Sequence, residues 1–306
     1  MNKLIYKIKN RFFRMTKESD KQKKPNYAEL IKYKNFIRKI NNNFVLSFGA
    51  GRSGQNWFSK IFNSHQNWMG TCERFADYEA FYRYISYYNL PIDKQNFFNL
   101  LKLSSSRDMA KYQNTFISSP YFSFGVEELY KKLKPNYLIF HIRKPIDSIQ
   151  SFYQKGWYLN SNDFMNNSPS IDITNSLYRS FSRIIPKNDY LDEWYKLSRI
   201  GKLTWFWTTT NRAIYSSFNK IKNVEKLFVK LEDVDQNYEM YEKLSERFNF
   251  KKKLKKKSFE NVLNKSPNFE FDYAYKYKDW SKIEKKEFES IIEKNFQDYD
   301  KIKTII

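Results

Sequence analysis

The sequence predicts an α/β protein with a central, mostly parallel β-sheet, helices on both faces and a helical insertion. Short apolar runs bounded by turn residues recur along the chain and alternate with stretches of helical periodicity. A glycine-rich segment joins the first of these runs to a helix. The 306 residues are 41% hydrophobic, which is enough for a large core. We expect one domain over residues 27–306, behind a basic tail at 1–26.

The stretch from Phe44 to Phe58, FVLSFGAGRSGQNWF, is central to this prediction. Its apolar run is interrupted only by Ser47 and is too short for most helices, so we expect a buried strand. Glycines at 49, 51 and 54 then break the pattern, and helical spacing resumes at Gln55. A strand, a glycine-rich turn and a helix in this order direct backbone N–H groups toward an anion. The alternative is a turn of the same shape that binds no ligand.

The same stretch matches the nucleotide P-loop, G-x-x-x-x-G-K-[ST], only in part. Gly49 and Gly54 fit its two glycines. Gln55 stands where the P-loop lysine is required, and Asn56 stands where the magnesium-binding Ser or Thr is required. The sequence therefore predicts a phosphate site that needs no Mg²⁺, and it predicts no metal site.

The next elements are a short strand and a long helical segment. Residues 65–74 indicate a helix end followed by a second strand, which would place Glu73 at the carboxyl edge of the sheet. From Phe75 to about Ser119 the aromatic-rich spacing is helical, and we expect this insertion to cover the functional face. Its aromatic stripe is more typical of packing than of a binding site for a second substrate.

The remaining elements complete the predicted sheet and its helices. A strand over 136–143 ends at Arg143, and Pro145 suits the first turn of a helix that we predict to end at Tyr158. Residues 160–200 form a polar, variable segment, and the lysine-rich residues 251–257 indicate a solvated turn. We predict a further strand over Lys226–Leu231 and helices over Trp205–Phe218, Glu239–Phe250 and Asp279–Tyr299.

The composition is strongly basic, with a formal net charge of +22. Such a charge indicates an anionic partner, which could be a nucleotide, a sulfated or phosphorylated ligand, nucleic acid or an anionic membrane. Much of the excess is lysine scattered among Asn, Ile and Tyr, so it has little weight on its own. The single cysteine, Cys72, excludes an internal disulfide and fits a reducing compartment, and we expect a cytoplasmic protein.

The N-terminal tail carries no apolar run long enough to cross a membrane and no uninterrupted apolar core of a secretory signal. Leu4, Ile5, Ile8 and Phe12 nevertheless recur at helical spacing among basic residues. Two interpretations stay open. The tail is either a helix in peripheral contact with an anionic membrane or a solvated basic helix.

Two segments resemble the nucleotide-binding motifs of the PAPS-dependent sulfotransferases. GAGRSGQNW resembles the phosphosulfate loop of that family. HIRKPIDSIQSFYQKGW resembles its 3′-phosphate motif, in which an Arg at a strand end precedes a Ser by eight residues, as Arg143 precedes Ser151 here. FVKLEDV and KDWSKIEKKEFESIIEKNF resemble a later strand and the closing helix, so the resemblance extends from about residue 44 to 299.

The resemblance implies a P-loop NTPase-like sulfotransferase fold. It also implies that a sulfuryl group passes from PAPS to a hydroxyl or amine acceptor, with release of PAP and without a metal. Arg52 stands where hormone and phenol members have Lys, and the GRSG form is closer to bacterial carbohydrate or lipid members and to Golgi-type members. The implied donor-binding residues are Gly51, Arg52, Ser53, Gly54, Gln55, Asn56, Trp57, Arg143, Ser151 and, on a looser match, Lys265.

The resemblance also implies catalytic roles for Arg52 and Glu73. Arg52, with the loop N–H groups, would stabilise the negative charge that develops on the leaving phosphate. Glu73 is the predicted general base, because carboxylate-base members carry their glutamate at this place. Partial burial would raise its pKa, which Arg52 and Arg74 would oppose. The alternative is a surface glutamate paired with Arg74.

Two other function classes stay open at the level of sequence. A P-loop-type kinase that uses ATP would share the fold, but the Lys-[ST] pair is missing. A basic nucleic-acid-binding or membrane-binding protein would explain the charge but not the paired phosphate motifs, and we expect no nucleic acid as a partner. The acceptor can be a carbohydrate, a lipid, a small alcohol or a peptide tyrosine, and the oligomeric state is equally open.

Overall fold

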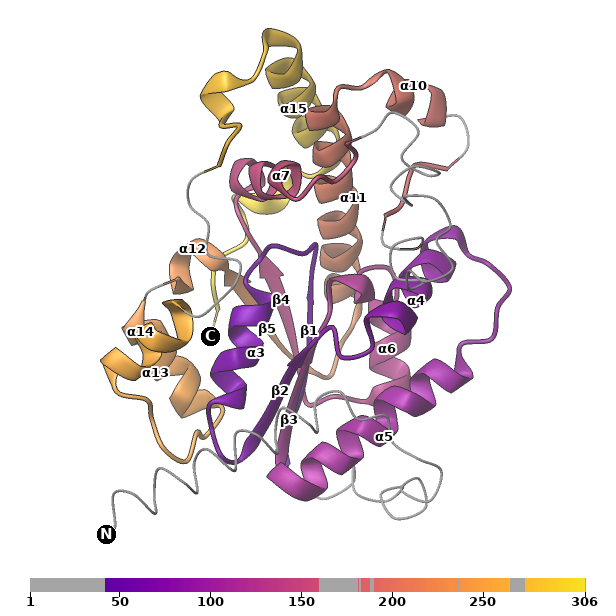
Figure 1. Cartoon of the computed structure of the whole chain (residues 1–306). Helices are drawn as coiled ribbons and strands as arrows, with labels where there is room; N and C mark the ends of the chain where they lie inside the picture. The colour runs from indigo at the N-terminus through magenta and orange to yellow at the C-terminus, as the bar shows by residue number, and fades with distance from the viewer. Residues whose placement is uncertain are drawn as a thin grey trace.

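The computed structural model contains one five-stranded sheet in the order β2-β3-β1-β4-β5, in which all neighbouring strands are parallel. The residues that it describes are 42–159, 181, 183–187, 190–235, 237–264 and 273–305. The strands are β1 (Phe44–Gly49), β2 (Trp68–Cys72), β3 (Asn114–Ser118), β4 (Tyr137–Ile142) and β5 (Glu225–Lys230), as Figure 1 shows. The predicted α/β fold with a parallel central sheet is confirmed.

Helices cover both faces of this sheet (Figure 1). They are α3 (Gln55–Asn63), α4 (Ala76–Tyr88), α5 (Gln95–Tyr112), α6 (Val126–Leu133), α7 (Pro145–Gln154), α10 (Tyr190–Lys196), α11 (Arg199–Lys220), α12 (Leu231–Val234), α13 (Tyr238–Arg247), α14 (Lys256–Asn264) and α15 (Lys282–Asn295). In the described part of the chain, no helix is long and apolar enough to cross a membrane. The basic tail at 1–26, Lys265 and residues 160–180 lie outside the described residues.

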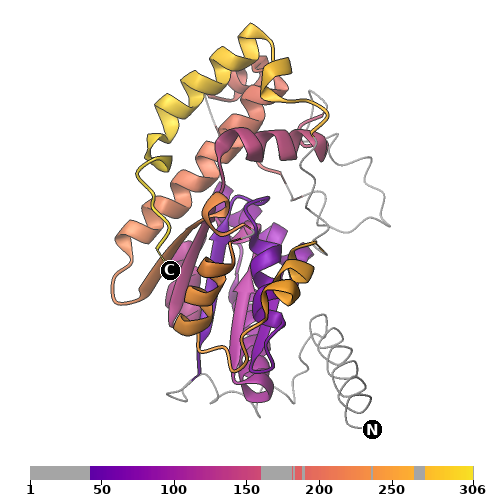
Figure 2. The ribbon, with the colours of Figure 1, turned by 90° about the vertical axis from the view of Figure 1, so that its left-hand side faces the viewer.

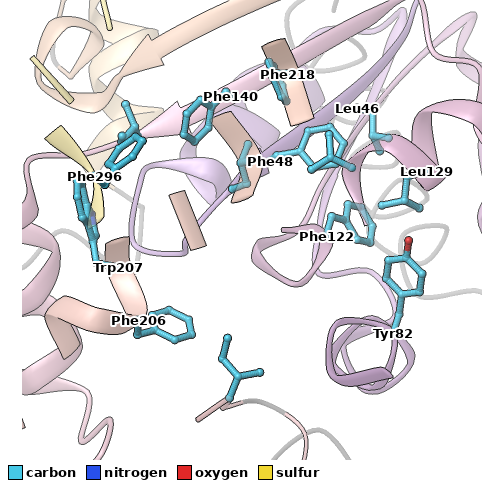
Figure 3. Packing of buried hydrophobic residues seen from close by; sticks show 14 of the residues in the cluster. Leu46, Phe48, Tyr82, Phe122, Leu129, Phe140, Phe206, Trp207, Phe218 and Phe296 are labelled. Atoms are coloured by element: carbon cyan, nitrogen blue, oxygen red, sulfur yellow. The ribbon is translucent and has the colours of Figure 1, made fainter. Parts of the chain in front are cut away.

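Strand side chains alternate between two hydrophobic cores. Phe44, Leu46 and Phe48 of β1 enter a core shared with α5, α6 and α11, and Figure 3 shows Phe48 there among Phe140 and Phe218. Val45 enters a second core under α3 and α13. Every residue of β1 is buried, as is expected for a strand covered on both faces.

The order of the strands places β1 where the connections change direction. From β1 the chain runs to the edge strand β2, returns to β3 beside β1, and then crosses through α6 to β4 on the other side. After β1 the chain enters α3 in the second core, whereas after β4 it enters α7 in the first core. Open parallel sheets bind their ligands at the carboxyl ends of two strands related in this way.

Helices α7, α11 and α15 extend the fold beyond this carboxyl edge (Figure 2). α11 packs against both α7 and α15. Its N-cap residue Ser198 donates its backbone N–H to the carboxylate of Glu287 on α15, and Trp207 packs against Phe296 at a ring distance of 5.7 Å. Ser151 of α7 lies within hydrogen-bond distance of Arg52, in the loop that follows β1.

The predicted helical insertion is right for two helices and wrong for its last residues. α4 and α5 form, but Asn114–Ser118 is β3, which lies between β2 and β1 in the sheet. This strand follows α5 after a single residue and is largely polar, so it shows no apolar run. Its polar groups are satisfied inside the protein. Asn114 accepts the Asn43 N–H at 2.7 Å and donates from Nδ2 to the Asn67 carbonyl oxygen at 2.9 Å.

Several predicted boundaries also shift. α7 ends at Gln154 and not at Tyr158, because the chain turns through Gly156 at a φ of +74°. α13 ends at Arg247, before the predicted Phe250. Within the lysine-rich turn predicted at 251–257, residues from Lys256 already belong to α14.

Gly70 marks the closest approach between β2 and α3. A Cβ at this position would lie 2.0 Å from the Ser59 carbonyl oxygen and 2.8 Å from the Asn63 amide nitrogen. We expect Gly70→Ala to lower the free energy of unfolding by about 3 kcal/mol, because two backbone segments must separate. Chemical denaturation measures this loss. Gly156→Ala is the control, because a Cβ there meets nothing within 4 Å and only the positive φ is unfavourable. It should cost about 1 kcal/mol, and equal losses for the two variants would contradict the close approach.

Candidate functional site

The loop after β1 turns into α3 through left-handed backbone conformations. Gly51 and Gly54 have φ values of +88° and +86°, as expected from their sequence positions, and Arg52 has a φ of +56°. Gly54 is the N-cap of α3, and no side chain within the described residues caps this helix. The first N–H groups of α3 therefore face the loop, in an arrangement that suits an anion.

Gly49 and Ser53 show how tightly the loop closes over the strand end. A Cβ on Gly49 would lie 2.6 Å from Ser53 Oγ and 2.8 Å from the His141 carbonyl oxygen. Ser53 is only 3% exposed, and its Oγ has no hydrogen-bond partner among the residues that the structure describes. A buried hydroxyl without a hydrogen-bond partner destabilises the fold. A phosphate oxygen bound at the loop would accept its hydrogen bond.

Three of the predicted phosphate-binding residues meet beside the loop. Arg52 Nε donates to Ser151 Oγ at 2.6 Å, across 99 positions of sequence. Arg143 Nη1 donates to the Arg52 carbonyl oxygen at 3.5 Å. Arg143 Nη2 donates to the Tyr273 hydroxyl at 3.0 Å, a contact that the sequence did not reveal. Two motifs that are distant in sequence are therefore adjacent in space.

The other predicted loop residues use their side chains in the framework. Gln55 Nε2 donates to Ser118 Oγ at 3.0 Å, and Ser118 Oγ donates to Ser47 Oγ at 3.2 Å, which ties α3 to the ends of β3 and β1. Asn56 is half-buried, and Trp57 packs edge-on against Phe259 at a ring distance of 6.0 Å. Because both side chains are engaged in this way, Gln55 and Trp57 would contact an anion through their backbone N–H groups and not through their side chains.

Glu73 follows β2 at the carboxyl edge of the sheet, as expected. Its φ is +52°, and its N–H donates to the Ser118 carbonyl oxygen at 3.0 Å. Burial raises the pKa of its carboxyl, and the charges of Arg83, Arg183 and Arg52 oppose this rise, with Arg83 the strongest of the three.

Arg74, which the alternative interpretation paired with Glu73, lies against Asp108 instead. It donates from Nη1 and Nη2 to the two carboxylate oxygens of Asp108 at 2.6 and 3.2 Å. Both side chains are 1% exposed, so this is a buried, bidentate ion pair between the β2 end and α5. The charges that act on the Glu73 carboxyl come instead from Arg83, Arg183 and Arg52.

Sequence reasoning missed Arg83 and Arg183. Arg83 on α4 is 1% exposed, and its guanidinium carbon lies 4.5 Å from the ring centre of Tyr121 and 5.6 Å from that of Phe206. The guanidinium carbon of Arg183 lies 3.7 Å from the ring centre of Trp157. The signal for Arg83 was a charge inside the aromatic helical stretch FADYEAFYRYISYY. Arg183 carried no such signal, because it lies in the segment predicted to be variable.

A second carboxyl, that of Glu79, is buried near Glu73. Its Oε1 accepts the Phe75 N–H at 3.0 Å, and its side chain lies on the inner side of α4. Burial raises the pKa of Glu79 to about 7, against the lowering effect of hydrogen bonds from the Ser119 hydroxyl and the Phe75 N–H, while the charge of Glu73 adds to the rise. Glu79 was not among the predicted site residues.

The two histidines of the chain serve the framework, as expected. His141 is fully buried with its ring 4.3 Å from that of Phe58, and burial lowers its pKa to about 3. His65 stacks on Phe250 at a ring distance of 3.9 Å. Among the described residues there is no group of three His, Cys, Asp or Glu side chains that could hold a metal ion.

No family model matches the chain, and comparisons with curated proteins and with solved structures also give no match. A function for this site must therefore be inferred from the geometry of its residues and from the resemblance of its motifs.

Glu79 makes the stability of the protein depend on pH. Its pKa rises from an ordinary 4.5 to about 7 on folding, so between these values the unfolded chain loses a proton that the folded chain keeps. This titration should cost the wild type about 3 kcal/mol of stability as pH rises through the window, and Glu79→Gln should remove that cost. Burial lowers the pKa of His141 to about 3, which acts in the opposite direction but equally in both proteins, so the difference between wild type and variant measures Glu79. Chemical denaturation of both proteins at pH 4.5 and pH 8 measures the difference. Glu239→Gln, at an exposed glutamate of α13, is the control and should behave as the wild type does. A wild type and a Glu79→Gln variant with parallel pH dependence would refute the assignment.

Proposed function

We propose that this protein is a PAPS-dependent sulfotransferase, which transfers a sulfuryl group to a hydroxyl or amine acceptor and releases PAP. The proposal depends on one observation above all, the convergence of Arg52, Ser151 and Arg143 beside the N-terminus of α3. The segments that resemble the phosphosulfate loop and the 3′-phosphate motif follow adjacent strands, β1 and β4. Nothing in the sequence spacing alone requires this adjacency.

The loop fits the 5′-phosphosulfate of the donor. Its left-handed residues and the N-terminus of α3, which no described side chain caps, offer backbone N–H groups, and Ser53 offers a buried hydroxyl. Arg143 and Ser151 fit the 3′-phosphate, which takes no part in bond breaking. They should therefore act on donor affinity and orientation more than on the chemical step.

In the proposed reaction the acceptor oxygen attacks sulfur as the bond from sulfur to the bridging phosphate oxygen breaks. The acceptor proton passes to the Glu73 carboxylate. Negative charge develops on the leaving phosphate, where Arg52 and the loop N–H groups stabilise it. Each such preorganised donor is worth about 3–4 kcal/mol in a transition state.

The acceptor belongs to the proposal only as a class: a carbohydrate, a lipid or a small alcohol. A cytoplasmic location is likewise proposed, from the single cysteine. A kinase remains the main competing activity. At the position of the P-loop lysine, however, the chain has Gln55, whose amide is engaged with Ser118. A neutral amide supplies no charge to a γ-phosphate.

The donor site can be tested by thermal unfolding. We expect PAP without metal to raise the midpoint by several degrees, because a ligand at about 100 times its Kd adds roughly 2.7 kcal/mol. Arg143→Ala and Ser151→Ala should weaken this shift. Mg·ATP is the competing ligand, and Arg212→Ala, on the exposed side of α11, is the control for lost charge. A shift with Mg·ATP alone would replace the sulfotransferase hypothesis with the kinase.

Glu73→Gln separates the proposed base from the donor site. The amide cannot accept the acceptor proton, so kcat should fall by about 10²–10⁴-fold, while PAP still stabilises the variant. In the wild type the rate should rise with pH through the raised pKa of Glu73, because only the carboxylate acts as a base. Transfer of ³⁵S from labelled PAPS to an acceptor panel measures both effects. A Glu73→Gln variant with unchanged kcat and an unchanged pH profile would exclude Glu73 as the base.

A further inference from the structure

The strand order separates two sides of the proposed reaction centre. Arg143 and Ser151, on the donor side, follow β4 on one side of β1. Glu73, on the acceptor side, follows β2, which lies beyond β3 on the other side of β1. Three strand spacings, roughly 14 Å, separate β2 from β4. Groups that cluster around Glu73 therefore belong to the acceptor side and not to the 3′-phosphate side.

Two aromatic residues connect the loop to the arginines of the acceptor side. A Cβ on Gly51 would lie 3.5 Å from Trp157 Cη2 and 3.5 Å from Pro120 Cβ, so both residues border the loop. Arg183 stacks on Trp157 at 3.7 Å, and Arg83 stacks on Tyr121, the residue after Pro120, at 4.5 Å. The charges of both arginines also act on the carboxyl of Glu73. Two cations thus lie near both the loop and the proposed base.

From this placement we propose that Arg83 and Arg183 bind an anionic group of the acceptor, so that the preferred acceptors carry a carboxylate or phosphate close to the reacting hydroxyl. The inference rests on the proposed function, and it adds the acceptor class that the motifs leave open.

The chemistry of arginine suits this role. A guanidinium stacked on a ring directs its N–H groups along the ring plane, and its planar fork matches a carboxylate or phosphate in two-point contact. It has five N–H donors, so it can keep a protein partner and still bind a ligand anion. Arg83 is 1% exposed and packs against the rings of Tyr121 and Phe206, which restricts its movement. A rigid, poorly solvated cation discriminates strongly between charged and neutral ligands.

The test compares matched neutral and anionic ligands on PAP-saturated protein by calorimetry. Methyl glucuronoside against methyl glucoside represents an acidic sugar, and glycerol 3-phosphate against glycerol represents a phospholipid headgroup. In at least one pair the anion should bind about tenfold or more tightly than the neutral ligand. The pair with the larger ratio identifies the source of the anion. No preference in either pair, or no binding of either anion at millimolar concentration, would overturn the inference.

Variants connect the preference to the residues. Arg183→Gln should reduce the ratio of anion to neutral binding to near one, and Arg83→Gln should act in the same direction if it folds. Arg212→Gln removes an equal charge from the exposed side of α11 and should leave the ratio unchanged. A preference that survives Arg183→Gln in full, or one that Arg212→Gln also removes, would refute the assignment. Stabilisation by PAP is measured on the same samples. Its absence would reject the sulfotransferase itself, whereas its presence without the charge preference would reject only the acceptor class.

Discussion

The burial of β1 on both faces and both edges is the constraint on which the candidate site depends. β1 pairs with β3 and β4, and all six of its residues are buried. At its end a Cβ on Gly49 would collide with the His141 carbonyl oxygen of the neighbouring strand. The chain can leave this position only by turning sharply over the sheet edge. That turn uses the positive φ values of residues 51, 52 and 54 and brings the N-terminus of α3 to the edge.

This constraint explains why so much of the fold could be predicted from the sequence. A strand buried on two faces must be a short apolar run, as FVLSFG in β1 and YLIFHI in β4 are. The edge strand β5, EKLFVK, is buried only at alternate positions and still shows the apolar stretch LFV. β3 is the exception, since it reads NTFIS and its polar side chains are satisfied by Asn43, Asn67 and Ser47. Those partners come from other elements, so no local pattern could have revealed them. The order of the strands could not be predicted from the sequence either, because it too depends on contacts between distant elements.

The residues of the candidate site also divide into those that the sequence could predict and those that it could not. Arg52, Arg143 and Ser151 could be named in advance because they lie within two recognisable local patterns. Arg83, Arg183 and Tyr273 could not, because each reaches the site from a segment whose own sequence indicates only packing or a loop. The alternative pairing of Arg74 with Glu73 fails for a related reason. Proximity in sequence suggested Glu73, but the fold brings Asp108 of α5 to within 2.6 Å.

Electrostatics around Glu73 follow from two opposed effects. Burial raises the pKa of its carboxyl, whereas the charges of Arg83, Arg183 and Arg52 lower it. The net effect is a pKa above the ordinary value of a glutamate, which would suit the general base of the proposed reaction. The same arginines lower the cost of bringing a negatively charged acceptor next to a carboxylate. In the proposed reaction a single cluster of cations would both adjust the pKa of the base and select the acceptor, which would account for the burial of a residue as costly to bury as Arg83 against aromatic rings.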